Sequence, residues 1–127
     1  MKEIIHTPDA PGSALYSQAV KVGPAIYVSG MVGIDPKTGR LAGPTIQEQT
    51  RQALGNCEAV LAAAGARREN IVDVHVLLAR AGDFAGLNEA YAAFFPTDPP
   101  ARAVGKLGVE LADVLVSIKL TAVLWDD

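Results

Sequence analysis

The residues best suited to chemistry lie at positions 99–106, where a lone arginine follows two prolines. Proline fixes φ and biases its neighbour toward extended backbone, so residues 101–106 are predicted to form a β-strand. Because side chains alternate between the faces of a strand, Arg102 and Lys106 share one face, about 13 Å apart along the strand. A guanidinium fixed on a strand suits bidentate binding of a small carboxylate. We therefore expect a carboxylate site built around Arg102.

Apolar runs and turn signals predict the other strands, which must position this one. They are expected at residues 2–6, 16–22, 25–32, 70–79 and 114–125. Gly23-Pro24 predicts a hairpin, and residues 35–40 a turn. In the last strand one face carries Val116, Ile118, Leu120, Ala122 and Leu124, and the opposite face carries Leu115, Ser117, Lys119, Thr121 and Val123.

Two amphipathic helices are predicted between the strands. Thr45 and Glu48 have the spacing of a capping box, and Gly65 ends the helix behind it. The apolar stripe of this helix is Ile46, Ala53, Leu54, Cys57, Val60, Leu61 and Ala64. Asp83 is expected to cap a second helix that ends before Pro96, with the stripe Phe84, Leu87, Tyr91 and Phe94.

The element order is therefore β-β-β-α-β-α-β-β, and it indicates an α+β fold in which two helices cover one face of a mixed sheet. The chain has 127 residues and no linker or repeat, so residues 1–127 are predicted to form a single domain. The other face of the sheet mixes apolar and polar side chains, which suits a subunit interface that contains a site.

Composition excludes several classes of protein. The net charge of −3 and the lack of a basic cluster argue against a nucleic-acid partner. One cysteine permits no internal disulfide, and no apolar run approaches a membrane span or a signal peptide. These features predict a cytoplasmic chain with no membrane partner.

Metal and cofactor chemistry are not expected. His6 and His75 are isolated, without other ligands at metal-binding spacing. The sequence contains neither a phosphate-binding loop nor a Gly-x-Gly fingerprint. Cys57 lies on the apolar stripe of the first helix, so we expect a packed thiol and not a nucleophile.

Five stretches resemble one family, in the order and at the spacing that its members show. They are Tyr16-Ser17-Gln18-Ala19-Val20, Val28-Ser29-Gly30-Met31, Asp35-Pro36-Lys37-Thr38-Gly39, residues 84–95 and Pro100-Ala101-Arg102-Ala103. The chain thus resembles the RidA family, also called YjgF or endoribonuclease L-PSP. The resemblance implies a chorismate-mutase-like fold, a homotrimer with a cleft between subunits, and cofactor-free hydrolysis of enamines and imines such as 2-aminoacrylate and 2-iminopropanoate.

The resemblance also assigns site residues. It implies that Arg102 binds the substrate carboxylate and that Tyr16 and Asn88 line the cleft. It implies further that the backbone of Ser29 and Gly30 approaches the ligand. Val104 stands where many members have cysteine, at a position where the family uses mainly backbone groups.

The last strand departs from the family pattern. Members proper have two acidic residues where this chain has Ser117 and Lys119, and the first of them positions the attacking water. Ser117 can hydrogen-bond a water but is a poor base, so a slower or differently specific enzyme is expected. Met31 also follows Gly30 where glutamine is common.

Lys106 and Lys119 suggest a more basic cleft. If both share a face with Arg102, the site would favour a dianionic ligand or use a desolvated lysine as an amine catalyst. Alternatively, both lysines reach solvent or pair with acids such as Glu110 across the subunit interface. A separate alternative is that Arg102 makes only an ion pair between subunits.

Three functions follow from these observations. The first is hydrolytic deamination of small imine carboxylates, with Arg102 and Ser117 as the catalytic pair. The second, which the missing glutamate favours, is binding of small carboxylates such as 2-oxo acids without turnover. The third, ribonuclease or translation-inhibitor activity, is disfavoured by the acidic charge and the lack of an aromatic stacking platform.

Overall fold

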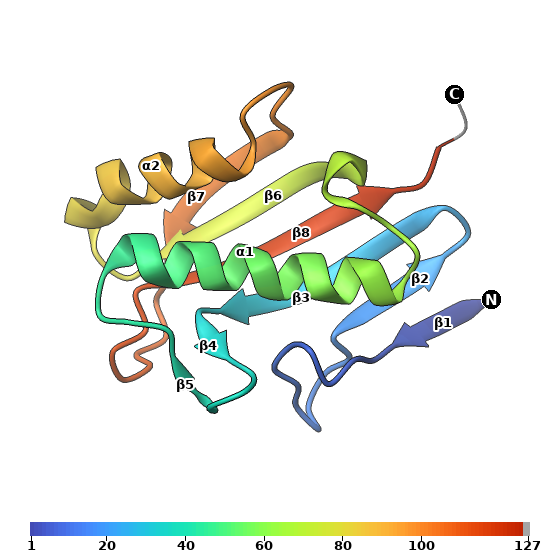
Figure 1. Cartoon of the computed structure of the whole chain (residues 1–127), viewed down its shortest axis with the longest axis horizontal. Coiled ribbons are helices and arrows are strands. Elements are labelled where there is room, and N and C mark those ends of the chain that lie inside the picture. The colour runs from blue at the N-terminus through green and yellow to red at the C-terminus, as the bar shows by residue number, and fades with distance from the viewer. Residues whose placement is uncertain (126–127) are drawn as a thin grey trace.

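In the computed structural model, which describes residues 1–125, both α-helices lie on one face of a mixed six-stranded sheet (Figure 1). The last two residues of the predicted domain, Asp126 and Asp127, lie outside the described part of the chain. The elements are β1 (Lys2–Ile5), β2 (Ala19–Val22), β3 (Ala25–Val32), β4 (Ile34–Asp35), β5 (Arg40–Leu41), α1 (Ile46–Ala63), β6 (Ile71–Leu78), α2 (Phe84–Phe94), β7 (Ala101–Lys106) and β8 (Val116–Val123).

The strands of the main sheet run in the order β1-β2-β3-β8-β6-β7. All neighbours are antiparallel except β6 and β7, which are parallel and joined through α2. The predicted α+β class and element order are confirmed. The added hairpin β4–β5 was not predicted, because two-residue strands carry no periodicity. It encloses the predicted turn, in which Thr38 N and Gly39 N donate to Asp35 O at 3.2 and 2.8 Å.

The predicted strand over residues 16–22 is shorter than expected and starts at Ala19. Gln18, only 3% exposed, binds the loop before it. Its Oε1 accepts from Thr7 N at 2.7 Å, and its Nε2 lies 3.0 Å from the carbonyl oxygens of Thr7, Ala10 and Pro11. Buried backbone groups need partners, so this one side chain satisfies a loop that has no ladder to join.

Helix α1 begins and ends as predicted. Thr45 Oγ1 accepts from Glu48 N at 3.2 Å, Glu48 Oε1 accepts from Thr45 N at 3.3 Å, and Gly65 has a φ of +82°. Its predicted apolar stripe is entirely buried and packs on β3 and β8. Helix α1 therefore fixes the two central strands.

Gly55 lies in the middle of α1, and a Cβ built there meets no atom within 4 Å. Glycine costs about 1 kcal/mol against alanine in a helix interior. We therefore expect Gly55→Ala to raise the free energy of unfolding by about 1 kcal/mol in a denaturant titration. A loss of stability would show instead that a neighbouring molecule packs against this glycine.

Helix α2 begins differently from its prediction. Asp83 makes no side-chain cap; its Oδ2 instead accepts from Arg80 Nε at 3.1 Å in the 3₁₀ turn Ala81–Asp83. Leu87 and Tyr91 are buried as expected, but Phe84 is 46% exposed. The first turn of α2 therefore presents an aromatic ring at the surface.

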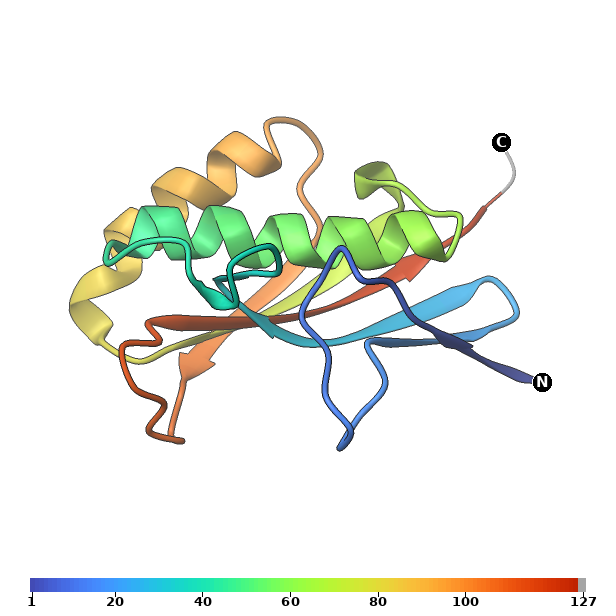
Figure 2. The same ribbon diagram turned by 60° about the horizontal axis from the view of Figure 1, so that its bottom comes forward.

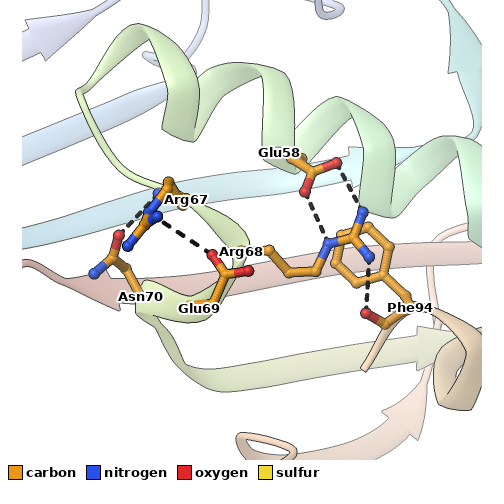
Figure 3. A network of polar contacts seen from close by, with 6 residues as sticks. All are labelled: Glu58, Arg67, Arg68, Glu69, Asn70 and Phe94. Atoms are coloured by element: carbon orange, nitrogen blue, oxygen red, sulfur yellow. Dashed lines mark hydrogen bonds and ion pairs between the residues drawn. The ribbon is translucent and has the colours of Figure 1, made fainter. Parts of the chain in front are cut away.

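Arg68 connects α1 to the end of α2 (Figure 3). Its Nε and Nη2 donate to the two carboxylate oxygens of Glu58 at 2.8 and 3.1 Å, and Nη1 donates to Phe94 O at 3.0 Å. The guanidinium also lies 3.7 Å from the centre of the Phe94 ring. A bidentate pair with a stacked ring requires the planar guanidinium of arginine, which lysine lacks. Because Glu58 lies on α1 and Phe94 ends α2, this contact joins the two helices.

The second face of the sheet carries no helix, and the loops on either side of it extend past it (Figure 2). Exposed apolar side chains on strands of the sheet include Tyr27, Val72 and Leu77, which are 48%, 39% and 39% exposed. We refer to this surface as the uncovered face.

Candidate carboxylate-binding site

Arg102 lies on the edge strand β7, on the face of the sheet that the helices cover. In the parallel register Val74 pairs with Arg102, and Leu78 pairs with Lys106. Val74 is fully buried under the helices, and paired residues of neighbouring strands point to the same face. The prediction that Arg102 and Lys106 share a face is confirmed.

The guanidinium of Arg102 is held by a neutral amide and two aromatic rings. Its Nη1 donates to Asn88 Oδ1 at 2.8 Å, and its Cζ lies 4.8 Å from the Tyr91 ring centre and 5.9 Å from that of Phe84. Within residues 1–125, no carboxylate forms an ion pair with Arg102. The side chain is thus oriented while its charge is left for an incoming anion.

Tyr91 provides the platform under this arginine. Its hydroxyl is buried without a hydrogen-bond partner in the described part of the chain. Burial raises the pKa of Tyr91, the Arg102 charge opposes that shift, and Asp73 adds to it. The phenol therefore stays neutral, and its ring face stabilises the cation.

Sequence reasoning placed Phe84 and Tyr91 in the core and missed their contact with Arg102. A signal was present, since Phe84, Asn88 and Tyr91 are spaced i, i+4 and i+7 and so share one side of a helix. A polar residue, Asn88, between two aromatic residues on this side of the helix indicated that a polar side chain from another element contacts it.

A second group of expected site residues lies on the uncovered face. Gly30, Ser117 and Lys119 line a cavity of about 380 Å³ together with His75 and Leu77. A Cβ at Gly30 would lie 3.1 Å from Ser117 Oγ, and the register of β3 shifts between Val28 and Met31 around it. The glycine thus marks a bulge.

Lys119 does not share a face with Arg102, because it pairs with His75 across β6 and β8 on the uncovered face. Its Nζ donates to Val28 O at 3.3 Å. Lys106, in contrast, shares the face of Arg102. The hypothesis of a basic cleft face with both lysines is therefore wrong for a single chain. Among residues 1–125, neither lysine pairs with Glu110.

Tyr16 and Ser29 form a third group. Ser29 N donates to Gln18 O at 2.9 Å, and its hydroxyl donates to Ser17 O. Tyr16 is half exposed and lines a cavity of about 720 Å³ beside the end of β1. One chain alone therefore does not bring Arg102, Ser117 and Tyr16 together.

No group of three His, Cys, Asp or Glu side chains in the described residues is placed to hold a metal ion. Nε2 of His75 lies 3.1 Å from Asp73 Oδ2. No helix among residues 1–125 has the length and apolar character needed to cross a membrane.

Cys57 is a buried thiol, and burial raises its pKa to about 12. At pH 8 we expect iodoacetamide to label it at least about a hundredfold more slowly than a free thiol, and to label it fully in guanidinium. The folded pKa exceeds the unfolded value of about 8.5, so the stability due to this group is full below pH 8.5 and declines toward pH 12. Fast labelling of the native protein would contradict this packing.

The sequence pattern of the family described as Endoribonuclease L-PSP matches residues 7–124. The human 2-iminobutanoate/2-iminopropanoate deaminase is 43% identical over 104 residues, which are 81% of this chain and 76% of that protein.

Solved structures agree with this match. The fold superposes on a putative endoribonuclease of Thermotoga maritima with a TM-score of 0.92 at 36% identity, covering 99% of this chain and 100% of that one. It superposes on E. coli TdcF with bound serine with a TM-score of 0.90 at 32% identity, covering 97% and 99%. The chain therefore belongs to the Endoribonuclease L-PSP family, the RidA family that its motifs resemble.

Proposed function

We propose that this protein is a hydrolytic deaminase of small enamine and imine carboxylates of the 2-aminoacrylate and 2-iminopropanoate type. The observation that carries the proposal is Arg102, oriented by Asn88 and the Tyr91 ring and free of any carboxylate in the described residues. The name of the human relative, an iminobutanoate and iminopropanoate deaminase, supports the reaction class.

The proposed reaction needs little covalent chemistry from the protein. Arg102 binds the carboxylate and places the neighbouring imine carbon, which is electrophilic when the imine is protonated. Water adds to that carbon, and one proton moves from the added oxygen to nitrogen. The C–N bond then breaks as the remaining hydroxyl gives up its proton to the leaving nitrogen, which yields a 2-oxo acid and ammonium. No oxidation or reduction occurs, so orientation and proton transfer supply the catalysis.

The remaining residues have lesser roles in this proposal. Ser117 hydrogen-bonds the attacking water, while backbone groups of Gly30 and Val104 bind the substrate. Tyr16, Ser29 and Asn88 shape the cleft. Because a single chain separates Arg102 from Ser117 and Tyr16, we propose a homotrimer in which each cleft combines residues of two subunits. The exposed apolar side chains of the uncovered face are available for this contact.

The test is a coupled assay. An L-amino-acid oxidase generates 2-iminopropanoate, semicarbazide traps what remains, and the protein is added with or without the Arg102→Ala substitution. Loss of the trapped product with wild type but not with the variant supports the deaminase. No acceleration across several imino acids overturns it. Light scattering on the same sample tests the trimer, and a monomer would overturn the shared cleft.

Ser117 favours a second candidate, a carboxylate-binding protein without turnover. A serine hydroxyl does not act as a base at neutral pH, and Lys119 in the same cavity adds a cation and no carboxylate. Binding of 2-oxobutanoate that Arg102→Ala abolishes, with no imine hydrolysis, would select this function. RNA cleavage by the purified protein would instead support the ribonuclease activity that the family description names.

A further inference from the structure

A second cavity lies next to Arg102 on the helix-covered side of β7. Its volume is about 520 Å³, and it is lined by Leu78, Ala79, Ala81, Phe84, Val104, Gly105 and Lys106. Lys106 is the single charged side chain in this lining, and most of the remaining side chains are apolar. A mostly apolar cavity with a small number of polar groups is the usual form of a small-molecule site.

Phe84 connects this cavity to the arginine. Its ring lines the cavity, and the same ring centre is 5.9 Å from Arg102 Cζ. On β7, Val104 lies between Arg102 and Lys106 and shares their face. Arg102, Val104, Lys106 and the Phe84 ring thus form one continuous surface. It has a cation at each end, and Val104 and Phe84 lie between them.

Neither cation is neutralised by the described residues. Lys106 and Arg102 form no ion pair with any carboxylate in residues 1–125. Asp83, the acid of the turn that borders the cavity, already pairs with Arg80 at 3.1 Å. Two unpaired cations joined by an apolar path are complementary to a ligand with an anion at each end.

We propose that the substrate at Arg102 is a dicarboxylate, an acidic 2-imino acid such as 2-iminoglutarate. The carboxylate next to the imine binds Arg102, the carbon chain lies against Phe84 and Val104, and the distal carboxylate binds Lys106. The flexible four-carbon stem of lysine lets its ammonium follow the length of the chain. This inference rests on the proposed function, since it names the substrate class of the same site.

Stable 2-oxo acids test the inference without turnover. Calorimetric titration of the full chain at low salt compares 2-oxoglutarate with the monocarboxylate 2-oxobutanoate. We expect 2-oxoglutarate to bind about five- to tenfold more tightly, as one partly exposed charge pair allows. This preference should decline as salt is raised.

Substitutions assign the preference to one side chain. Lys106→Gln should weaken 2-oxoglutarate binding by about five- to tenfold and change 2-oxobutanoate binding less than about twofold. Lys106→Arg keeps the charge and should keep the preference. Lys37→Gln, at an exposed lysine of the 35–40 turn, is the matched control and should leave both affinities unchanged.

The outcomes separate this inference from the proposed function. Equal binding of the two acids, or a Lys106→Gln effect of equal size on both, overturns the dicarboxylate assignment even if imine hydrolysis is observed. A Lys106-dependent preference without imine hydrolysis supports the assignment and overturns the deaminase. Failure of both acids to bind overturns the dicarboxylate assignment, while the trapping assay alone decides the deaminase.

Discussion

Arg102→Ala is expected to lower kcat/KM for imine hydrolysis by about 100- to 1,000-fold, the loss of roughly two charge-assisted hydrogen bonds to the carboxylate. The fold should persist, because Arg102 is exposed on an edge strand and, within residues 1–125, its hydrogen-bond and cation–π partners are Asn88 and two aromatic rings. The semicarbazide-trapping assay gives kcat/KM, and circular dichroism reports the fold.

Two further variants distinguish charge from geometry. Arg102→Lys restores the charge without the planar fork, so we expect kcat/KM about tenfold below wild type. Asn88→Ala removes the group that orients the guanidinium, and it should mainly raise KM, by about fivefold. If Arg102→Ala hydrolyses imines as fast as wild type, the arginine does not bind the substrate, and the deaminase proposal loses its anchor.

The order of elements was predictable because long periodic segments determine it. The apolar stripe of α1 is regular over more than two turns and is buried as expected. In β8 the alternation is regular over more than six residues, and Val116, Ile118, Leu120 and Ala122 of the predicted face are buried, while Leu124 beyond the strand is partly buried. Short or irregular features were not predictable. The strands β4 and β5 have two residues each, and the late start of β2 at Ala19 depends on Gln18 binding a loop.

The site was predictable only in part. Alternation along β7 correctly placed Arg102 and Lys106 on one face. Side chains alternate every residue along a strand, so the shared face depends only on the strand itself. The relation of Lys119 to Arg102 is not local. It depends on the antiparallel pairing of β8 with β6 and the parallel pairing of β7 with β6. Sequence spacing carries no information on that register, so the hypothesis of two lysines on the face of Arg102 was wrong for Lys119.

The largest effect on stability is expected from Gly33→Ala, at the end of β3 where the chain passes under α1. A Cβ at this position would lie 2.6 Å from the carbonyl oxygen and 2.7 Å from the Cα of Gln49. Those are backbone atoms of a helix, so no side chain can rotate away and α1 must shift. We expect the free energy of unfolding to fall by about 3 kcal/mol or more in a denaturant titration.

The shift would also break contacts that Gln49 makes. Its side chain is fully buried; Nε2 donates to Gly43 O at 3.0 Å and Asp113 O at 2.9 Å, and Oε1 accepts from Leu115 N at 2.9 Å. Moving α1 leaves these groups unpaired, which adds to the cost of the clash. Gly55→Ala is the matched control, because it adds the same methyl group on α1 itself, at a position where the methyl group enters open space. A Gly33→Ala protein as stable as wild type would mean that α1 can move off β3 at little cost, and hence that this glycine does not fix the distance between the helix and the sheet.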